Sequence, residues 1–473
     1  MAELDAVVVG AGPNGLSAAV EIARNGGSVL VLEAADTVGG GCRTQELTLA
    51  GFKHDVCSAI HPMAAASPFF NSLPLADHGL EWILPPIQIG HPMDDGPAVL
   101  VHKSLNHTAQ DLGSDERAYH KLFDPLVRNA DEIARGFLTP LLRFPKNPIA
   151  MARFGLRALP SAQKYLAANF AGDRAKAMLA GNAAHALQPL DRPLTMGFAL
   201  IYNVLAHSVG WPYPRGGSQS LVDALASYLE SLGGRIETGS PVKTFADIPS
   251  ANAVLFDLSP RQIVEIAGDE LPARYRRKLE DFKYGPAVFK IDWALSEPIP
   301  WKGEGASQAG CLHLGGTLEE IAESERRSAA GEHPDRPWVI LAQQSLFDDT
   351  RAPSGKHTAW SYCHVPNGST VDMTEVVENQ VERFAPGFRD TILARATKTA
   401  VDLEAYNANY VGGDIASGRA NIGQILGRPV MSPSPHKTPN KKIYICSQSS
   451  APGPGVHGMC GYFAAQAALR RLH

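Results

Sequence analysis

Three glycines near the N-terminus have the spacing of a nucleotide-binding turn. Gly10, Gly12 and Gly15 stand in the sequence GAGPNG, directly after an apolar run at residues 6–9. In such a turn the first glycine permits a tight bend, the second lets a diphosphate approach the main chain, and the third lets the next helix pack closely on the strand. The N-terminus of that helix presents free amides and a positive dipole end to phosphate. The spacing therefore predicts a dinucleotide-binding site.

The elements around this turn follow in the order that the site requires. An apolar-periodic helix opens at Pro13 and Asn14, and a second apolar run at residues 29–32 ends at Glu33 and Ala34. A carboxylate at the end of the second strand accepts hydrogen bonds from a ribose hydroxyl. The same carboxylate repels a phosphorylated ribose. We therefore expect FAD or NAD at this site, and not NADP.

A second glycine cluster favours FAD over NAD. Gly40, Gly41, Cys42 and Arg43 follow within ten residues of Glu33. The glycines let the chain fold back against the diphosphate, and Arg43 supplies a cation near phosphate or flavin. This cluster is typical of FAD enzymes, and nicotinamide dehydrogenases lack it. FAD is the predicted cofactor, and a glycine-rich surface loop with a solvated arginine is the alternative.

A third glycine-rich turn precedes the last helix. Gly453, Gly455 and Gly458 repeat the spacing, but neither a second strand nor a ribose-binding acid follows before His473. We therefore expect this turn to aim helix amides at the flavin pyrimidine edge, which becomes electron-rich on reduction. A turn that only packs is the alternative. The predicted contacts at this end are Ser447, Val456, Gly458 and Met459.

Composition excludes several classes of function. The chain has 473 residues and a formal net charge of −5, so no basic surplus indicates nucleic-acid binding. Six cysteines form no CxxC pair, and no zinc-type spacing occurs, so neither a redox disulfide nor a metal site is expected. The first strand begins too early to leave room for a signal peptide, and no apolar run approaches a membrane span. A cytoplasmic location is expected, and the oligomeric state is left open.

The order of patterns predicts an α/β fold in which a Rossmann-type FAD-binding domain is interleaved with an α+β substrate domain. In the substrate domain we expect an antiparallel sheet, in which residues 287–295 alternate as a half-exposed strand. The expected parts are 1–75, 206–270 and 411–473 for the FAD-binding domain, 76–205 for a mostly helical substrate or lid domain, and 271–410 for the substrate-domain sheet.

The whole chain resembles a known superfamily. The segments GAGPNG, EAADTVGGGCRT, HDVCSAIHP, YGPAVFKIDWALSEPIPW, HTAWSYCHVPNG, NYVGGDIASG and IYICSQSSAPGPGVHGMCGY are similar to those of phytoene dehydrogenase and carotenoid desaturase-like FAD oxidoreductases. The likeness is closest to the branch named for pyridine nucleotide-disulfide oxidoreductase domain-containing protein 2. It implies FAD, a two-domain amine-oxidase-like fold and an organic substrate. It also implies that Val242 meets the adenine, and that Ala59 and His61 lie near the isoalloxazine.

Histidines are the first candidates for proton transfer. His61 lies in the segment expected beside the flavin, and His457 lies in the glycine turn facing it, so these two are the predicted catalytic residues. His207, His313 and Tyr362 are further titratable side chains to inspect. Each of them has a purely structural role as its alternative. No Ser/His/Asp spacing and no pair of carboxylates indicates another mechanism.

One apolar segment carries only positive charges. Residues 133–172 contain arginine and lysine but neither aspartate nor glutamate, amid many large apolar side chains. A cationic apolar segment can lie on an anionic membrane surface and receive a lipid-soluble substrate. A packed lid or an oligomer face with a basic rim is the alternative, and the sequence leaves both open.

Three functions remain open. The leading hypothesis is an FAD-dependent desaturase, saturase or isomerase that acts on an apolar molecule by hydride transfer involving flavin N5. The second is an FAD amine oxidase, and the third is a flavin-binding protein that acts mainly within a partner complex. Because a second βαβ unit is missing, NADPH alone is not expected to reduce the flavin quickly.

Overall fold

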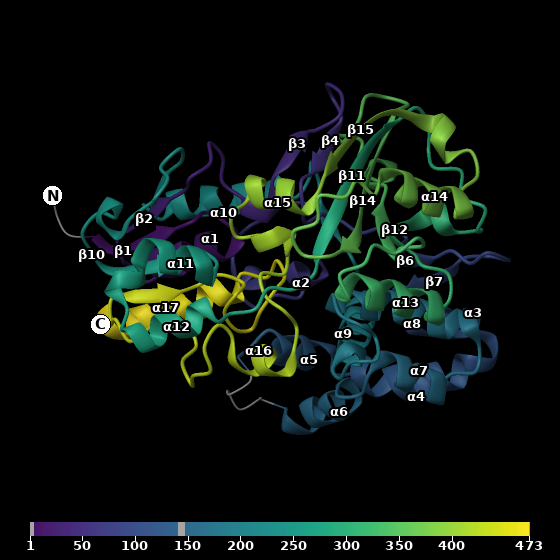
Figure 1. Ribbon diagram of the computed structural model, residues 1–473, viewed down its shortest axis with the longest axis horizontal. Coiled ribbons are helices and arrows are strands. Elements are labelled where there is room, and N and C mark those ends of the chain that lie inside the picture. The colour runs from purple at the N-terminus through teal and green to yellow at the C-terminus, as the bar shows by residue number, and fades with distance from the viewer. Residues whose placement is uncertain (1–3, 141–146, 473) are drawn as a thin grey trace.

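A computed structural model describes residues 4–140 and 147–472 of the chain. Figure 1 shows two sheets side by side, with most helices of residues 105–208 gathered below the second sheet. The first sheet is parallel and the second is mixed. The expected α/β fold, a Rossmann-type domain interleaved with an α+β domain, is confirmed.

The first sheet is built from three distant stretches of the chain. Its strand order is β16-β10-β1-β2-β9, and all paired neighbours run parallel. Residues 6–9 are buried on both faces because helices cover both sides, which explains their continuous apolar run. The strands are β1 (Leu4–Val9), β2 (Val29–Leu32), β9 (Arg235–Glu237), β10 (Ala251–Phe256) and β16 (Ile443–Ile445).

The first and last helices of the chain pack directly on each other. They are α1 (Pro13–Arg24) and α17 (Met459–Leu472), and a Cβ atom at Gly461 would lie 1.9 Å from the Asn14 carbonyl oxygen. Only glycine permits this approach, which brings the C-terminal turn beside the first glycine loop. The other helices of this domain are α10 (Gln219–Ser231), α11 (Pro260–Ala267) and α12 (Ala273–Glu280).

The second sheet has seven strands in the order β15-β11-β14-β13-β12-β6-β7. Neighbours are antiparallel except β12 and β6, so the sheet is mixed where an antiparallel one was expected. Two of its strands come from residues 76–205, which were predicted to be mostly helical. The strands are β6 (Ile87–His91), β7 (Val99–His102), β11 (Ala287–Leu295), β12 (Ala309–Leu314), β13 (Val339–Ala342), β14 (His357–Val365) and β15 (Ile392–Lys398).

The prediction that residues 287–295 form a half-exposed strand is wrong. All nine residues of β11 are buried, although their polar and apolar side chains do alternate. Lys290 and Asp292 form a buried ion pair on the polar face, and His54 of the neighbouring hairpin approaches Asp292 within 3.6 Å. Paired charges can be buried where single charges cannot, so alternation alone does not report exposure.

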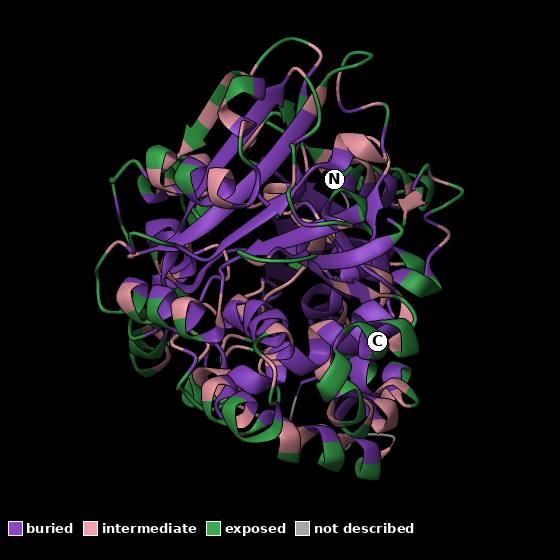
Figure 2. Cartoon of the chain, turned by 90° about the vertical axis from the view of Figure 1, so that its right-hand side faces the viewer, coloured by how far each residue is buried: buried purple, intermediate pink, exposed green. Residues whose placement is uncertain are grey.

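Helices α3–α9 form a layer against the second sheet, and Figure 2 shows their inner faces buried and their outer faces exposed. Within the described residues, no helix has both the length and the hydropathy to cross a membrane. These helices are α3 (Leu105–Asp111), α4 (Glu116–Val127), α5 (Ala130–Phe137), α6 (Pro148–Ala158), α7 (Ala162–Asn169), α8 (Asp173–Ala183) and α9 (Thr195–Ser208).

Short elements connect the two sheets. The hairpin of β3 and β4 leads from the second glycine cluster to the substrate sheet, and β5 pairs with β8. The remaining elements are β3 (Thr44–Glu46), β4 (Lys53–Asp55), β5 (Trp82–Ile83), β8 (Tyr213–Pro214), α2 (Pro62–Ala65), α13 (Leu318–Ala329), α14 (Thr374–Phe384), α15 (Ala400–Tyr406) and α16 (Ile422–Gly427).

Candidate functional site

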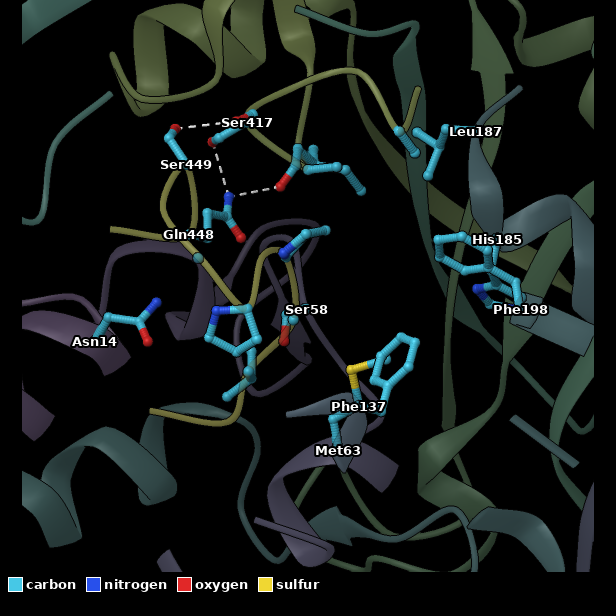
Figure 3. A pocket seen from close by; sticks show the side chains of 18 of the residues that line it. Asn14, Ser58, Met63, Phe137, His185, Leu187, Phe198, Ser417, Gln448 and Ser449 are labelled. Carbon is cyan, nitrogen blue, oxygen red and sulfur yellow. Dashed lines mark hydrogen bonds between the residues drawn. The ribbon is translucent and has the colours of Figure 1, made fainter. Parts of the chain in front are cut away.

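One cavity of about 680 Å³ runs between the two domains. It begins at the first glycine loop and passes the second glycine cluster and the C-terminal turn. It then reaches α5, α6 and α16. Figure 3 shows polar side chains such as Asn14 and Gln448 on one side of this cavity, and Phe137, Leu187 and Phe198 on the other. The cavity therefore has a polar end and an apolar end.

The polar end contains hydrogen-bonding atoms without a protein partner. Asn14 Oδ1 and Ser447 Oγ are buried and unpaired within the described residues. Gln448 Nε2 donates to the Ser417 hydroxyl at 2.8 Å, which orients the amide along the wall. Buried polar atoms are normally satisfied, so unpaired ones lining a cavity indicate a polar ligand. This end fits a dinucleotide held mainly by main-chain and neutral groups.

Asp257 places a carboxylate at the glycine loop. The Gly15 amide donates to Asp257 Oδ2 at 2.9 Å, and a Cβ atom at Gly12 would meet the same oxygen at 2.6 Å. Burial raises the pKa of Asp257 well above its usual range, and the nearby Glu33 charge adds to this, while the Gly15 and Gly12 amides oppose it. Asn409 holds the segment by donating to the Asp257 carbonyl at 3.1 Å. Sequence reasoning missed this acid because it lies more than 240 residues from the loop.

Arg428 is a buried cation on the cavity wall. Its guanidinium donates to the Gly418 carbonyl at 2.9 Å, and its Nε has no partner among the described residues. Burial lowers the pKa of Arg428, and the Asp414 carboxylate opposes that shift. The guanidinium lies against Gly453 of the C-terminal turn. It is the single arginine or lysine among the described residues that line the cavity.

Glu33 and Arg43 pair with each other at the end of β2. Arg43 Nη2 donates to Glu33 Oε1 at 3.1 Å, and the Ala11 and Ala35 amides donate to the two carboxylate oxygens. Arg43 also donates to the Thr37 carbonyl at 2.8 Å. Its charge is thus directed to Glu33, and Arg428 rather than Arg43 lies on the cavity wall. The expected role of Arg43 as a cation near phosphate or flavin stays a prediction.

The predicted cofactor-binding residues fall into two groups. Those that line the cavity are Gly12, Pro13, Asn14, Gly40, Gly41, Cys42, Ala59, His61, Ser447 and Val456. The others are absent from its wall and are Gly10, Gly15, Glu33, Ala34, Arg43, Val242, Gly458 and Met459. Ala34 is exposed, and Val242 packs against the core of the first domain. The roles of both groups stay predictions.

His61 lines the cavity with a defined tautomer. Ser218 Oγ donates to the Ser58 carbonyl, so His61 Nε2 donates to Ser218 Oγ at 2.7 Å. This leaves Nδ1 as the proton-accepting atom, 3.4 Å from Ser58 Oγ. Burial lowers the pKa of His61 to about 4 although the Asp55 carboxylate opposes the shift, so the ring is neutral at neutral pH. Such a ring is a weak base.

His457 bridges the main chain of the C-terminal turn. The Met459 amide donates to its Nδ1 at 3.0 Å, and its Nε2 donates to the Gly453 carbonyl at 3.2 Å. Burial lowers the pKa of His457 to about 4. Both ring nitrogens and the Met459 amide therefore form hydrogen bonds within the turn, so in this structure His457 stabilises the conformation of the turn. Its predicted catalytic role remains a prediction.

The remaining titratable candidates lie in different places. His207 is buried in the helical layer and hydrogen-bonds to Tyr119 at 2.7 Å. His313 lies on β12, where its Nε2 is 3.0 Å from that of His185. Burial lowers the pKa of His185 to about 3 and that of His313 well below its usual range. Of these candidates, Tyr362 lines the cavity, as does His185.

The inner wall of the apolar end is aromatic, and its outer wall is helical, with aliphatic side chains together with Phe137 and Phe154. Trp360 and Tyr362 stand edge to face with ring centroids 5.3 Å apart. No carboxylate other than Asp257 lines the cavity among the described residues. The apolar side chains are Phe137, Met151, Phe154, Leu159, Leu187, Leu194, Phe198, Tyr202, Trp211, Ile340, Trp360, Ile422, Ile425 and Leu426.

The described residues contain neither a disulfide nor a candidate metal-binding site. All six cysteines are buried and unpaired, and burial raises the pKa of the Cys42 and Cys57 thiols. A raised pKa keeps a thiol protonated and unreactive. No group of three metal-ligating side chains occurs in the described part of the chain.

Comparison with known proteins agrees with this geometry. A family profile described as NAD(P)-binding Rossmann-like domain matches residues 8–73. The chain is 26% identical to pyridine nucleotide-disulfide oxidoreductase domain-containing protein 2 of Rattus norvegicus, over 99% of this chain and 94% of that protein. It is 24% identical to carotenoid 3,4-desaturase of Haloarcula japonica, over 96% and 95%. The chain is a homologue of these oxidoreductases.

A solved structure extends the likeness to the fold. Wild-type putrescine oxidase bound to putrescine aligns with a TM-score of 0.61 at 15% identity, covering 100% of this chain and 98% of that one. This likeness confirms the fold alone. The family profile and the related proteins above confirm the resemblance predicted from the sequence motifs and the dinucleotide-binding oxidoreductase class. The homologue's name mentions a disulfide, yet this chain's cysteines are unpaired.

Proposed function

We propose that this protein is an FAD-dependent oxidoreductase that transfers hydride to or from an apolar organic molecule. The observation that carries the proposal is the single cavity joining the glycine loops to an apolar helical end. When bound, FAD supplies a two-electron acceptor or donor at its ring. The polar end suits the nucleotide, and the apolar end suits a hydrocarbon-like substrate.

The chain's own residues would position the reactants. The main-chain amides of the first glycine loop and the Asn14 side chain would hold the polar part of the cofactor. Trp360 and Tyr362 would confine the substrate, and neighbouring helices would exclude water. The neutral His61 Nδ1 is a proton acceptor on the cavity wall. Desaturation, saturation and isomerisation all fit this arrangement.

Amine oxidation is the second candidate, and the aromatic wall favours it. Trp360, Tyr362, Tyr202 and Trp211 line the inner half of the cavity, as expected for a site that flanks a flavin with aromatic rings. Within the described residues no carboxylate lines that half, which argues against a cationic diamine such as the ligand of putrescine oxidase. A neutral, apolar amine would still fit.

Anaerobic reduction of the bound flavin tests the proposal. The purified yellow protein is mixed without oxygen with polyene, isoprenoid and alkylamine panels while the flavin absorbance is followed. Bleaching by an apolar hydrocarbon supports the leading function, whereas bleaching by amines followed by peroxide release in air supports the second. A sample whose flavin has first been reduced by light tests for saturase activity. A polyene that accepts electrons from the reduced flavin would restore the yellow colour of the oxidised flavin. A protein that binds no flavin would refute both.

A further inference from the structure

Two helices at the outer end of the cavity carry exposed apolar side chains. Six of the twelve large apolar side chains exposed in the described chain lie on or next to α6 and α16. Leu156, Ile149 and Met431 are the three most exposed of the twelve, at 71%, 66% and 66%. We name this surface the mouth patch, and it comprises Ile149, Leu156, Leu159, Ile422, Leu426 and Met431.

The mouth patch is continuous with the cavity. Leu159, Ile422 and Leu426 line the cavity and are also half or more exposed, so the cavity opens among them. Figure 1 shows α16 beside α5 and α6 at the lower edge of the molecule. Met431 packs against the end of α16, where a Cβ atom at Gly427 would meet its side chain at 2.8 Å.

Helix α6 is apolar on both faces. Ala150, Phe154 and Ala158 recur at intervals of four and are buried toward the protein. Ile149 and Leu156 lie on the opposite face together with Arg153, and all three are exposed. The outer face of α6 thus combines exposed apolar side chains with a cation, a combination found on helices that lie at an anionic lipid surface.

Charge on the two helices of the patch has a single sign. Neither α6 nor α16 contains an acidic residue, and no aspartate or glutamate occurs anywhere after Asp414. Arg153 stands between the two exposed apolar residues of α6, and Arg419 precedes α16. A protein interface needs specific partners for such cations, whereas an anionic lipid surface accepts them in any arrangement.

We propose that the mouth patch docks the protein on an anionic lipid surface, with the cavity opening toward the lipid. Docking itself is independent of the reaction, while delivery of the substrate from the lipid rests on the proposed function. Part of the predicted cationic segment 133–172, residues 141–146 with Leu141, Leu142, Arg143, Phe144 and Lys146, lies outside the described residues.

Vesicle flotation of the flavin-loaded protein tests the docking. We expect binding to vesicles of phosphatidylcholine with phosphatidylglycerol, weaker binding to phosphatidylcholine alone, and release by salt. Ile149→Gln with Leu156→Gln should lower the partition coefficient at least about tenfold. Arg153→Gln should lower it about fivefold on anionic vesicles only. These three residues lie outside the cavity wall, so flavin content and turnover of detergent-dispersed substrate should stay unchanged.

Leu393→Gln is the matched control, because Leu393 is 48% exposed on β15, away from the patch. Wild-type protein that fails to float with anionic vesicles overturns the proposal. A dimer in light scattering that the double variant converts to a monomer also overturns it, since a second copy would then cover the patch. The flavin spectrum and thermal midpoint report whether each variant is folded, separately from docking.

Discussion

At the scale of single residues, Asp257 is the most consequential neighbour of the glycine loop. Its carboxyl accepts from the Gly15 amide, a donor of the kind that a diphosphate uses. Burial keeps the pKa of Asp257 high, so the carboxyl loses its proton only as the pH rises well above the usual carboxyl range. An ionised Asp257 would repel a diphosphate, whereas a protonated one would not.

We therefore predict that FAD affinity falls as pH rises and that Asp257→Asn removes this dependence. At alkaline pH the variant should bind FAD about tenfold more tightly, since one nearby charge in a partly buried site is worth more than a kcal/mol. Fluorescence titration of the apoprotein at several pH values measures this. Riboflavin has no diphosphate, so the affinity of the protein for riboflavin should depend neither on pH nor on the Asp257→Asn substitution. An unaltered pH slope in the variant would refute the role of Asp257.

The buried pair on β11 gives a second prediction at this scale. Lys290 and Asp292 are each about 2% exposed, and burial lowers the pKa of Lys290 and raises that of Asp292 to about 6. Lys290→Met alone leaves an uncompensated carboxylate and should cost about 3 kcal/mol, whereas Lys290→Met with Asp292→Asn should cost less. Thermal unfolding midpoints measure both. A double variant less stable than the single one would contradict the prediction.

The sign of the pH effect follows from the Asp292 shift. The folded-state pKa of about 6 exceeds the unfolded value of 3.8, so its contribution to stability is present below 3.8 and is lost as pH rises through about 6. Asp292→Asn should therefore flatten the dependence of the midpoint on pH in that window.

At the scale of elements, the contact between α1 and α17 joins the two ends of the chain. A Cβ atom at Gly461 would lie 1.9 Å from the carbonyl oxygen of Asn14 and 2.9 Å from the Ala18 amide nitrogen. Both atoms belong to the backbone, so neither can move aside without shifting a helix. This packing sets the distance between the glycine loop and the C-terminal turn.

Gly461→Ala should destabilise the protein by about 1–3 kcal/mol and weaken flavin retention. Gly155→Ala is the matched control, because Gly155 lies within α6 and a Cβ atom there would meet no atom within 4 Å. That change should be neutral or stabilise the helix by about 0.5–1 kcal/mol. Thermal midpoints and flavin content after gel filtration compare the two. If both variants changed the thermal midpoint and the flavin content equally, close packing of α1 on α17 would not explain why glycine is needed at position 461.

At the scale of the whole molecule, the cavity lies between two domains. Its lining residues come from each of the five chain segments that were expected to make up these domains. A ligand that binds there contacts both domains and should stabilise the folded state as a unit. We predict that FAD at about 100 times its dissociation constant adds about 2.7 kcal/mol, seen as a higher thermal midpoint. NADPH should give a much smaller shift and should not bleach the flavin quickly. Rapid bleaching by NADPH would contradict this, and would indicate a second nucleotide site.

Much of the first domain was predictable because its signals are local. The spacing of Gly10, Gly12 and Gly15, the apolar runs and the acid at Glu33 report backbone turns and buried strands within a few dozen residues. The sequence predicted the strand at residues 287–295 but not its burial, because exposure depends on which elements cover the polar face of the strand. The segment NYVGGDIASG was noticed without a role, and Asn409 within it proves to hold the end of β10.

The sequence by itself determined the dinucleotide turn, the interleaved fold and the absence of a cysteine pair, since each depends on spacing along the chain. Tertiary structure alone decided that Asp257 meets the glycine loop, that Arg428 and not Arg43 lines the cavity, and that β11 buries an ion pair. These contacts join residues that are distant in sequence or depend on side-chain burial. Such facts leave no periodic trace in a sequence, because only the packing of whole elements creates them.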